Sequence, residues 1–433
     1  MKRLLTCMLV LAMGSSVHAV GVIPLNNTDA YTGITRGLAV TVGPDHTVYV
    51  AGYSEAGGQA ATYWSVSGGT ATGTVLPADS TATYATVAQG IGVITSGTSA
   101  GAIVIAGNLG GASDWNSAIA GLDGNGWSRR RDTEWNGGNQ VPVGQPNAWG
   151  NQLAVAPDGQ HYYVTGKLSN KRCYVFNVDS QTGAQGSMVP TPGSTTDSDT
   201  WELPLASSSN YVGGVNPAAT TAGIYRETDW KYAWRHVYKQ GDIPTEGGEI
   251  PPASYDYWES YAAGISDDGN TITGYGKTTS AILAPVYWTQ SGGTWTAHYV
   301  DNGPMTSSSN ITDCNQDGTI LGGYVYVASM GGNNAAFWDT SVLDGGVPDL
   351  NFLADWLPAH GVPLMTGGVG WTIMQRIHGV HSDGDVTYLT GYGLWTEDGG
   401  GTTTSRGFLI TIPEPATLAV LALGGLAILR RRR

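Results

Sequence analysis

YAAGISDDGNTITGYGK, at residues 261–277, precedes two further short runs, APVYW at 284–288 and WTAHYV at 295–300. Within the first stretch, two apolar runs flank the Asp268-Gly269 pair, which is the pattern of a β-hairpin. Gly-rich connections join the later runs, as they join the short strands of a meander. Four short strands within about 40 residues are typical of one β-propeller blade.

The same order of strand, turn, strand and aromatic strand recurs along the chain. We place the turns of seven copies at Asp45, Ser99, Asp158, Ser209, Asp268, Asp317 and Asp383. The mean step is about 56 residues, within the range of blade-sized repeats. The composition agrees with an all-β fold, because 64 of the 433 residues are Gly and only 12% are charged.

The last copy shows only three strands before the tail. A closed ring therefore needs a fourth strand from elsewhere, and residues 20–25 are predicted to supply it and so remove exposed strand edges. One helix is expected in the body, over residues 348–357, where Leu350, Leu353, Ala354 and Leu357 fall at helical spacing before Pro358.

The stronger copies resemble the HAF-type extracellular repeat, with Gly-Ile-Ser-x-Asp-Gly at 264–269 and Ala-Phe-Trp at 336–338. This resemblance covers most of residues 37–411 and implies architecture rather than chemistry. The sequence predicts a β-propeller with seven blades as the first choice. Six or eight blades, or a β-sandwich, are the alternatives.

The N-terminus has the layout of a secretory signal peptide. Lys2 and Arg3 form a positive start, residues 4–13 form an apolar run, and small residues lead to a cut after Ala19. We expect signal peptidase to remove residues 1–19, which leaves 20–411 as the propeller body.

The C-terminal segment, 412–433, combines three features. Pro413, Glu414 and Pro415 form a stiff extended motif, residues 416–429 are apolar, and Arg430, Arg431, Arg432 and Arg433 end the chain. The apolar run is marginal for a membrane-spanning helix. The arginines would act as the membrane stop on the cytoplasmic side.

This order resembles the PEP-CTERM sorting signal. The resemblance implies recognition of Pro413, Glu414 and Pro415 by a membrane-embedded exosortase-type transpeptidase and loss of the transmembrane helix. It further implies transient anchorage in the inner membrane and delivery to the cell surface, outer membrane or exopolysaccharide matrix. A plain single-span anchor is the alternative.

The charge of the exported body restricts its partners. Outside the two ends, the chain keeps 14 basic and 33 acidic residues. Nucleic acid needs a basic face, so nucleic-acid binding is excluded, and anionic lipid is disfavoured. Divalent cations, neutral polysaccharide and another surface protein remain compatible with this charge.

The candidate ligand-binding residues are few. Asp313, Asn315 and Asp317 resemble the first half of an EF-hand calcium loop, although Tyr324 stands where the bidentate acid belongs. No cofactor other than calcium is expected. Alternation along a strand would place His378 and His381 on opposite faces, which argues against a zinc site.

No catalytic residue is assigned. The Gly-x-Ser-x-Gly match at 97–101 is followed by a strand rather than a helix, so Ser99 is interpreted as a turn residue. Trp127, Trp135, Trp230 and Trp234 are candidates for stacking on sugars, with packing between loops and ring as the alternative. The repeated Trp64, Trp288 and Trp338 are expected in the core.

Two classes of function follow. The first is a non-catalytic surface or matrix protein that binds polysaccharide or another protein. The second is a propeller enzyme acting on glycans, a glycosidase or a lyase. A glycosidase needs two carboxylates about 5–10 Å apart, whereas the acids at the turns are spread around the ring. A pocket with two acids and an exposed Trp would favour the enzyme.

Overall fold

The computed structural model describes residues 20–26, 33–55, 59–76, 86–108, 115–120, 127–131, 149–155, 161–167, 173–179, 185–190, 211–213, 220–226, 231–236, 249–250, 257–266, 270–278, 283–291, 294–300, 308–344, 346–399 and 401–413. Between residues 109 and 256, the strands are described by their backbone, with the side chains of Leu153, Val155 and Tyr162. The predicted signal peptide and residues 414–433 lie outside the described residues.

Seven sheets follow one another along the chain, and we number them 1 to 7. Sheet 1 contains β2 (Thr35–Val42), β3 (Val48–Glu55), β4 (Gln59–Ser67) and β5 (Thr70–Val75), and sheet 2 contains β6 (Val87–Val93), β7 (Ile103–Asn108), β8 (Trp115–Ala120) and β9 (Trp127–Arg131). Sheet 3 contains β10 (Trp149–Val155), β11 (His161–Lys167), β12 (Cys173–Asp179) and β13 (Gln185–Pro190), and sheet 4 contains β14 (Tyr211–Gly213), β15 (Thr220–Arg226), β16 (Lys231–His236) and β17 (Glu249–Ile250).

Sheet 5 contains β18 (Tyr257–Ile265), β19 (Thr271–Thr278), β20 (Leu283–Ser291) and β21 (Thr294–Tyr299), and sheet 6 contains β22 (Asn310–Cys314), β23 (Ile320–Val327), β24 (Gly332–Asp344) and β25 (Val347–Phe352). Sheet 7 contains β26 (Met365–Thr366), β27 (Val369–Asp383), β28 (Val386–Thr396) and β29 (Thr403–Pro413), together with β1 (Gly21–Leu25). The fold is all-β, as predicted. The short helices η2 (Ala328–Met330) and α2 (Leu353–Ala359) lie in or after sheet 6.

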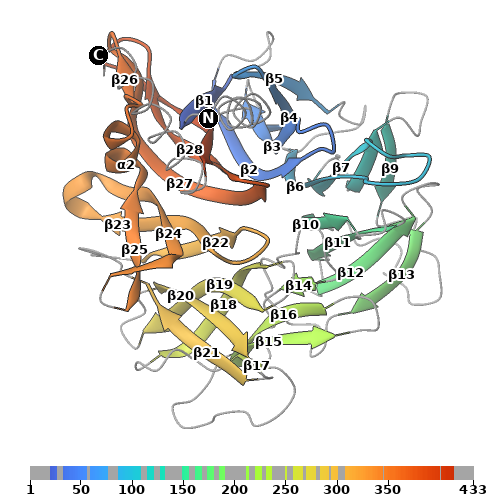
Figure 1. Ribbon diagram of the computed structural model, residues 1–433. Coiled ribbons are helices and arrows are strands. Elements are labelled where there is room, and N and C mark those ends of the chain that lie inside the picture. The colour runs from blue at the N-terminus through green and yellow to red at the C-terminus, as the bar shows by residue number, and fades with distance from the viewer. Residues whose placement is uncertain are drawn as a thin grey trace, which may run out of the picture.

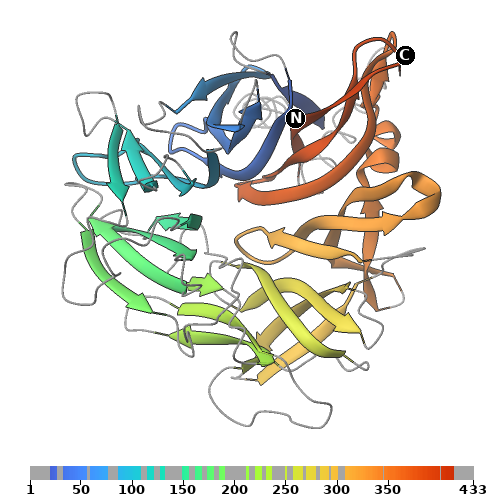
Figure 2. The ribbon, with the colours of Figure 1, turned by 180° about the vertical axis from the view of Figure 1, so that it is seen from behind.

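The sheets stand around a common centre, a propeller-like arrangement (Figures 1 and 2). Successive sheets contact one another through their innermost strands: β2 packs on β6, β6 on β10, β18 on β22, β22 on β27, and β27 returns to β2. Because both faces of a sheet are covered by its neighbours, strands such as β23 are buried along almost their whole length.

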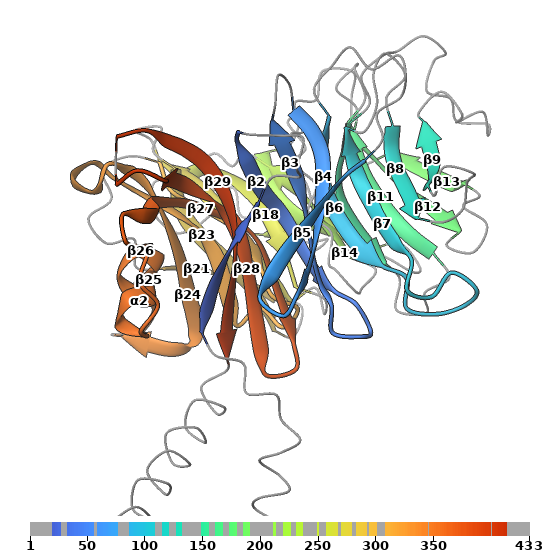
Figure 3. The same cartoon turned by 90° about the horizontal axis from the view of Figure 1, so that it is seen from above.

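The N-terminal strand completes sheet 7, as the sequence predicted. β1 runs antiparallel to β29, from the pair Gly21 and Thr411 to the pair Leu25 and Gly407. Figure 3 shows the blue first sheet beside the red last sheet at this seam. Thr35 of β2 ties the seam together, because its Oγ1 donates to the carbonyl oxygen of Leu25 (2.8 Å) and accepts from the amide of Gly407 (3.0 Å).

The repeated tryptophans are core residues, as expected. Trp64, Trp288 and Trp338 lie on the third strands of sheets 1, 5 and 6 and are 0% exposed. Each faces an apolar residue of the second strand, namely Val50, Ile272 and Leu321.

A second repeated feature is a β-bulge in the innermost strand, a local insertion that redirects side chains. The pairing register shifts around one residue in six of the seven sheets, at Leu38, Gln89, Asn151, Ala263, Thr312 and His378. This bulge interrupts the alternation assumed above for His378 and His381.

The hairpin turns at Asp45 and Asp317 follow the acidic pattern in the sequence, whereas the predicted turn residues Asp158 and Asp268 lie outside the described residues. Asp317 Oδ1 accepts hydrogen bonds from the amide (3.0 Å) and hydroxyl (2.6 Å) of Thr319, and Asp45 caps Thr47 in the same way. Gly318 supplies the positive φ (71°) that such a turn requires, whereas His46 adopts it (61°) in sheet 1. His46 Nδ1 lies 2.6 Å from Asp383 Oδ2, which joins the turns of sheets 1 and 7.

Two predictions need correction. The helix expected over 348–357 begins only at Leu353, because residues 347–352 extend sheet 6 as β25, and Pro358 lies inside α2 rather than after it. Sheet 4 has the order β14-β16-β15-β17 with β14 parallel to β16, unlike a regular meander. Ser209, its expected turn residue, lies outside the described residues.

Within the described ranges, no helix is long and apolar enough to cross a membrane.

Candidate functional site

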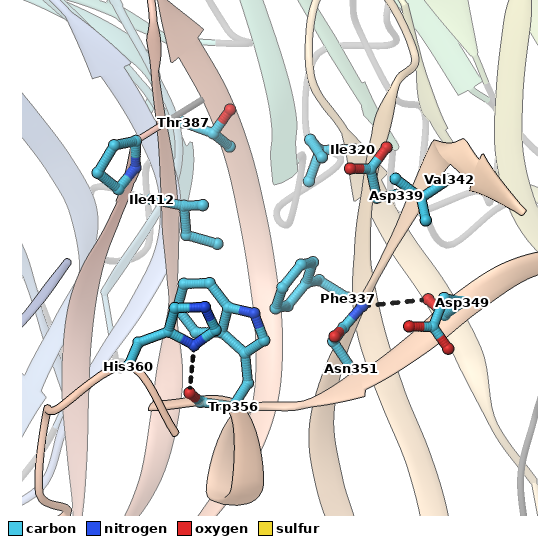
Figure 4. Close-up of a pocket in the computed structure, with 11 residues that line it drawn as sticks. Ile320, Phe337, Asp339, Val342, Asp349, Asn351, Trp356, His360, Thr387 and Ile412 are labelled. Atoms are coloured by element: carbon cyan, nitrogen blue, oxygen red, sulfur yellow. Dashed lines mark hydrogen bonds between the residues drawn. The ribbon is translucent and has the colours of Figure 1, made fainter. Parts of the chain in front are cut away.

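A pocket of about 230 Å³ opens between sheets 6 and 7, beside α2 (Figure 4). It is lined by the apolar residues Ile320, Phe337, Val342, Trp356, Ile412 and Pro413 and the polar residues Asp339, Asp349, Asn351, His360 and Thr387. The pocket is smaller than the roughly 300–1,000 Å³ of most small-molecule sites. It therefore suits one sugar unit or one side chain of a partner.

An aromatic pair forms one wall of the pocket. Leu353 and Leu357 are 0% exposed and anchor α2 in the core, which leaves Trp356 beside the pocket. The Trp356 ring meets Phe337 edge-on (centroids 5.3 Å apart) and stacks on His360 (4.0 Å). His360 Nδ1 lies 2.8 Å from the carbonyl oxygen of Trp356, and since a carbonyl only accepts, Nδ1 carries the hydrogen.

Two carboxyl groups lie at the same pocket. Asp339 of β24 and Asp349 of β25 are opposite each other in the sheet, so their Cβ atoms are about 5 Å apart. Asp339 Oδ1 accepts hydrogen bonds from the amide (2.9 Å) and hydroxyl (2.5 Å) of Ser341. The acid pair is the feature expected of a glycan-acting enzyme, but the Trp356 ring is covered by His360.

An exposed apolar hairpin tip adjoins the pocket. Val342, Leu343 and Val347, at the ends of β24 and β25, are 51%, 56% and 36% exposed. Apolar side chains gathered on a surface are typical of an interaction site. Val342 also lines the pocket, so the two features form one continuous surface.

The first proline of the sorting motif belongs to the folded body. β29 continues two residues beyond the expected boundary at 411, and Pro413 is buried opposite Val386. Proline cannot donate to a strand on both sides, and here the neighbouring β1 ends at the pair Gly21 and Thr411, before it reaches Pro413. Glu414, Pro415 and Arg430 to Arg433 lie outside the described residues.

The three calcium candidates are close together at the sheet 6 hairpin, and their oxygen atoms already accept hydrogen bonds. Asp313 Oδ2 accepts from the amide of Val380 in sheet 7 (2.8 Å), and Asn315 Oδ1 accepts from the amide of Ile320 (2.9 Å). In the described part of the chain, no group of three or more His, Cys, Asp or Glu is placed to hold a metal. Calcium binding by Asp313, Asn315 and Asp317 stays a prediction.

None of the four tryptophans proposed to stack on sugars has a side chain among the described residues. Trp127 starts β9 and Trp234 lies in β16, where only the backbone is described, and Trp135 and Trp230 lie outside the described residues. Sequence reasoning overlooked Trp356 and His360, because residues 348–357 read as an ordinary packing helix. The signal was present as Trp356 and His360 at helical i, i+4 spacing.

His46 is exposed, whereas His378 and His381 lie between sheets, and the three histidines therefore differ in their titration. The hydrogen bond and charge of Asp383 raise the pKa of His46 above its usual 6.5. Burial lowers the pKa of His378 to about 3, and the positive charges of Arg376 and Arg36 contribute to this lowering. Burial also lowers the pKa of His381 to about 4, and a ring nitrogen of His381 accepts from Gln316 Nε2 (2.8 Å).

We therefore predict three distinct titrations by histidine NMR. His46 should titrate above pH 6.5, while His378 and His381 should stay neutral from pH 8 to pH 5. Asp383→Asn should move the His46 midpoint downward, because it removes the charge that stabilises the imidazolium. Titration of His378 near pH 6.5 would contradict its burial beside two arginines.

Comparison with known protein families gives a match at the C-terminal tail. Residues 411–433 match the family model described as the PEP-CTERM protein-sorting motif. A motif of this class implies export, sorting to the surface and anchoring in the membrane by the C-terminus. More particularly, the chain carries the PEP-CTERM recognition signal of exosortases, joined to a propeller-like body. The comparison with curated proteins gave no match.

The similarity to solved structures is distant. A periplasmic gluconolactonase of Pseudomonas aeruginosa is 13% identical, with 73% of this chain and 88% of that chain covered and a TM-score of 0.39. The propeller domain of the Trilobed protease of Pyrococcus furiosus (10%, 85% and 97%, 0.39) and the α-L-arabinofuranosidase ARB93A of Fusarium graminearum (10%, 92% and 98%, 0.36) are similar at the same level. These likenesses assign no activity.

Proposed function

We propose that this protein is a non-catalytic binding or structural module of the cell surface or exopolysaccharide matrix. In this proposal, signal peptidase removes residues 1–19, and the body folds as a closed seven-bladed propeller. The C-terminal helix holds the precursor in the inner membrane until an exosortase-type transpeptidase acts at the motif of Pro413, Glu414 and Pro415.

The observation that carries the binding role is the pocket between sheets 6 and 7. Its lining combines apolar side chains with the polar groups of Asn351, His360 and the two aspartates. Such a surface fits a sugar ring, which has apolar faces and hydroxyl groups at its edge. The small volume favours holding one unit of a long polysaccharide over enclosing a substrate. We therefore assign polysaccharide as the ligand.

A glycan array on the full chain, purified in detergent because of its apolar tail, tests this function. Trp356→Ala should weaken binding of any glycan found by about 30-fold, since loss of a buried aromatic contact costs about 2 kcal/mol. Trp395→Ala is the matched control, because Trp395 is also partly buried against the same core but lies outside the pocket. Equal binding by both variants and the parent chain would rule out the pocket.

The second candidate is a glycan-acting enzyme, favoured by the facing pair Asp339 and Asp349. Turnover of each bound glycan should be assayed in parallel with binding. Product formation by the parent chain that disappears in Asp339→Asn or Asp349→Asn, with binding retained, would establish the enzyme instead.

A further inference from the structure

Two adjacent sheets carry an arginine at the same repeat position. Arg36 of β2 and Arg376 of β27 each lie two residues before the bulge and opposite a tyrosine, Tyr53 and Tyr392. At the equivalent positions of sheets 5 and 6, Tyr261 and Asn310 face Tyr275 and Tyr324. Arg36 lies where sheet 1 packs on sheet 7, and Arg376 lies where sheet 7 packs on sheet 6 (Figure 1), so the two arginines stand at adjacent seams of the ring, and the charges of both act on His378.

Each arginine is held against the tyrosine of the preceding sheet. The guanidinium carbon of Arg36 lies 4.2 Å from the ring centroid of Tyr392, and that of Arg376 lies 4.2 Å from Tyr324. Cation–π stacking of this kind fixes the plane of a guanidinium and leaves its N–H edges free to donate. The geometry is thus preorganised for a planar acceptor.

Few of these donors are used within the described part of the chain. Arg36 Nε donates to Ser405 Oγ (3.3 Å). In the amide orientation that satisfies both groups, Asn333 Oδ1 accepts from Arg376 Nη2 (2.9 Å) and Nε (3.2 Å). Among the described residues, no acceptor is found for the Arg36 Nη1 and Nη2 groups, for Arg376 Nη1 or for the second hydrogen of Arg376 Nη2.

Neither arginine has a counter-ion among the described residues. The described ion pairs are His46 with Asp383 and Arg406 with Glu397. Arg406 makes a useful comparison, because it also stacks on an aromatic ring, Trp395 (4.8 Å), yet its Nη2 contacts Glu397 Oε1 (3.0 Å). In a chain with 34 acidic and 20 basic residues, two partly buried arginines that have no described counter-ion form a local positive site. Burial strengthens their attraction for an anion.

His378 completes the site. The bulge in β27 places its ring against Tyr392, with centroids 5.6 Å apart and planes at 19°. Tyr392 therefore contacts both Arg36 and His378 and lies opposite Arg376 in the sheet. A neutral imidazole can donate a hydrogen bond to a hydroxyl group or accept one from it. Binding of a simple anion would need no such neutral group, so His378 favours a ligand that also carries hydroxyl groups.

We propose that Arg36, Arg376 and His378 bind a uronic acid unit of an acidic polysaccharide. The guanidinium groups would hold the carboxylate, since their fork geometry matches it, and His378 would bond a ring hydroxyl. The assignment of the ligand as a saccharide rests on the proposed function. The assignment of an anionic group to it rests on the two arginines alone. The site is distinct from the pocket: Gly407, opposite Tyr392, is six residues from Pro413, a strand length of about 20 Å.

Calorimetry of the full chain with trigalacturonate tests this site. We expect Arg36→Gln and Arg376→Gln each to weaken binding at least tenfold, because each removes a charge-assisted hydrogen bond. Arg376→Lys, which keeps the charge without the fork, should lose part of the affinity and serves if a glutamine variant misfolds. Arg406→Gln is the matched control and should bind like the parent chain. Methyl-esterified trigalacturonate, which lacks the charge, should not bind.

Three results would overturn the proposal. They are unchanged binding in Arg36→Gln and Arg376→Gln, equal binding of the methyl ester, and equal loss in Arg406→Gln. Inorganic sulfate bound as tightly as trigalacturonate would overturn the saccharide assignment. Trp356→Ala should leave trigalacturonate binding intact, so failure of this site and failure of the pocket are separately visible.

Discussion

A chain that lacks residues 20–25 should unfold at a markedly lower denaturant concentration than the chain that begins at Val20, or should aggregate. Leu25 is 0% exposed and packs with Val40, Val50, Trp64 and Leu409. Loss of a leucine side chain at such a site costs about 2–5 kcal/mol. The deletion also exposes β29 as an unpaired edge, which promotes association with other chains.

Urea unfolding followed by tryptophan fluorescence measures this effect. Leu25→Ala should reproduce the packing part of the loss while keeping the strand. Val342→Ala, at a site 51% exposed, is the control and should change stability by less than about 0.5 kcal/mol. A truncated chain with the same midpoint as the parent would show that β1 does not hold the ring closed.

Trp338→Ala should destabilise the body by about 3–5 kcal/mol, the cost of emptying a large buried aromatic site. Trp338 is 0% exposed and packs with Leu321, Val325 and Ala336 in the core of sheet 6. Trp338→Phe, which keeps an aromatic ring, should cost clearly less. Thermal and urea unfolding report both values.

The control for this pair is Leu343→Ala, at an apolar residue that is 56% exposed on the hairpin tip. It should leave the midpoint nearly unchanged. If Trp338→Ala were no more costly than Leu343→Ala, the repeated tryptophans would not be core residues.

Much of the fold could be predicted because each strong repeat carries two independent signals of its local structure. The Asp-Gly turns set the hairpins, and the tryptophan of the third strand marks the buried face. The count of three strands in the last unit pointed to β1, since a closed ring leaves no unpaired edge. Where the local signal was weak, as around Tyr211, the strand order of sheet 4 could not be anticipated.

The sites were harder to predict, because they depend on contacts between repeats. Trp356 joins a pocket only once β25 has extended sheet 6 and α2 has packed on sheet 7. Arg36 and Arg376 become neighbours only when the ring closes, and their tyrosine partners lie on the preceding sheet. The sequence of residues 348–357 also gave no sign that its first half forms a strand and its second half a helix. Pairing of β25 with β24 overrides the helical spacing of the first half.

Hydrogen exchange of the full chain, read by mass spectrometry over residues 20–25 and 403–413, tests the closed ring most directly. We expect both segments to exchange slowly and to lose protection together with β27 and β28, because β1 and β29 pair from Gly21 to Leu25. Exchange of residues 20–25 at the rate of an unstructured peptide would contradict closure of the ring and the seam on which the arginine site depends.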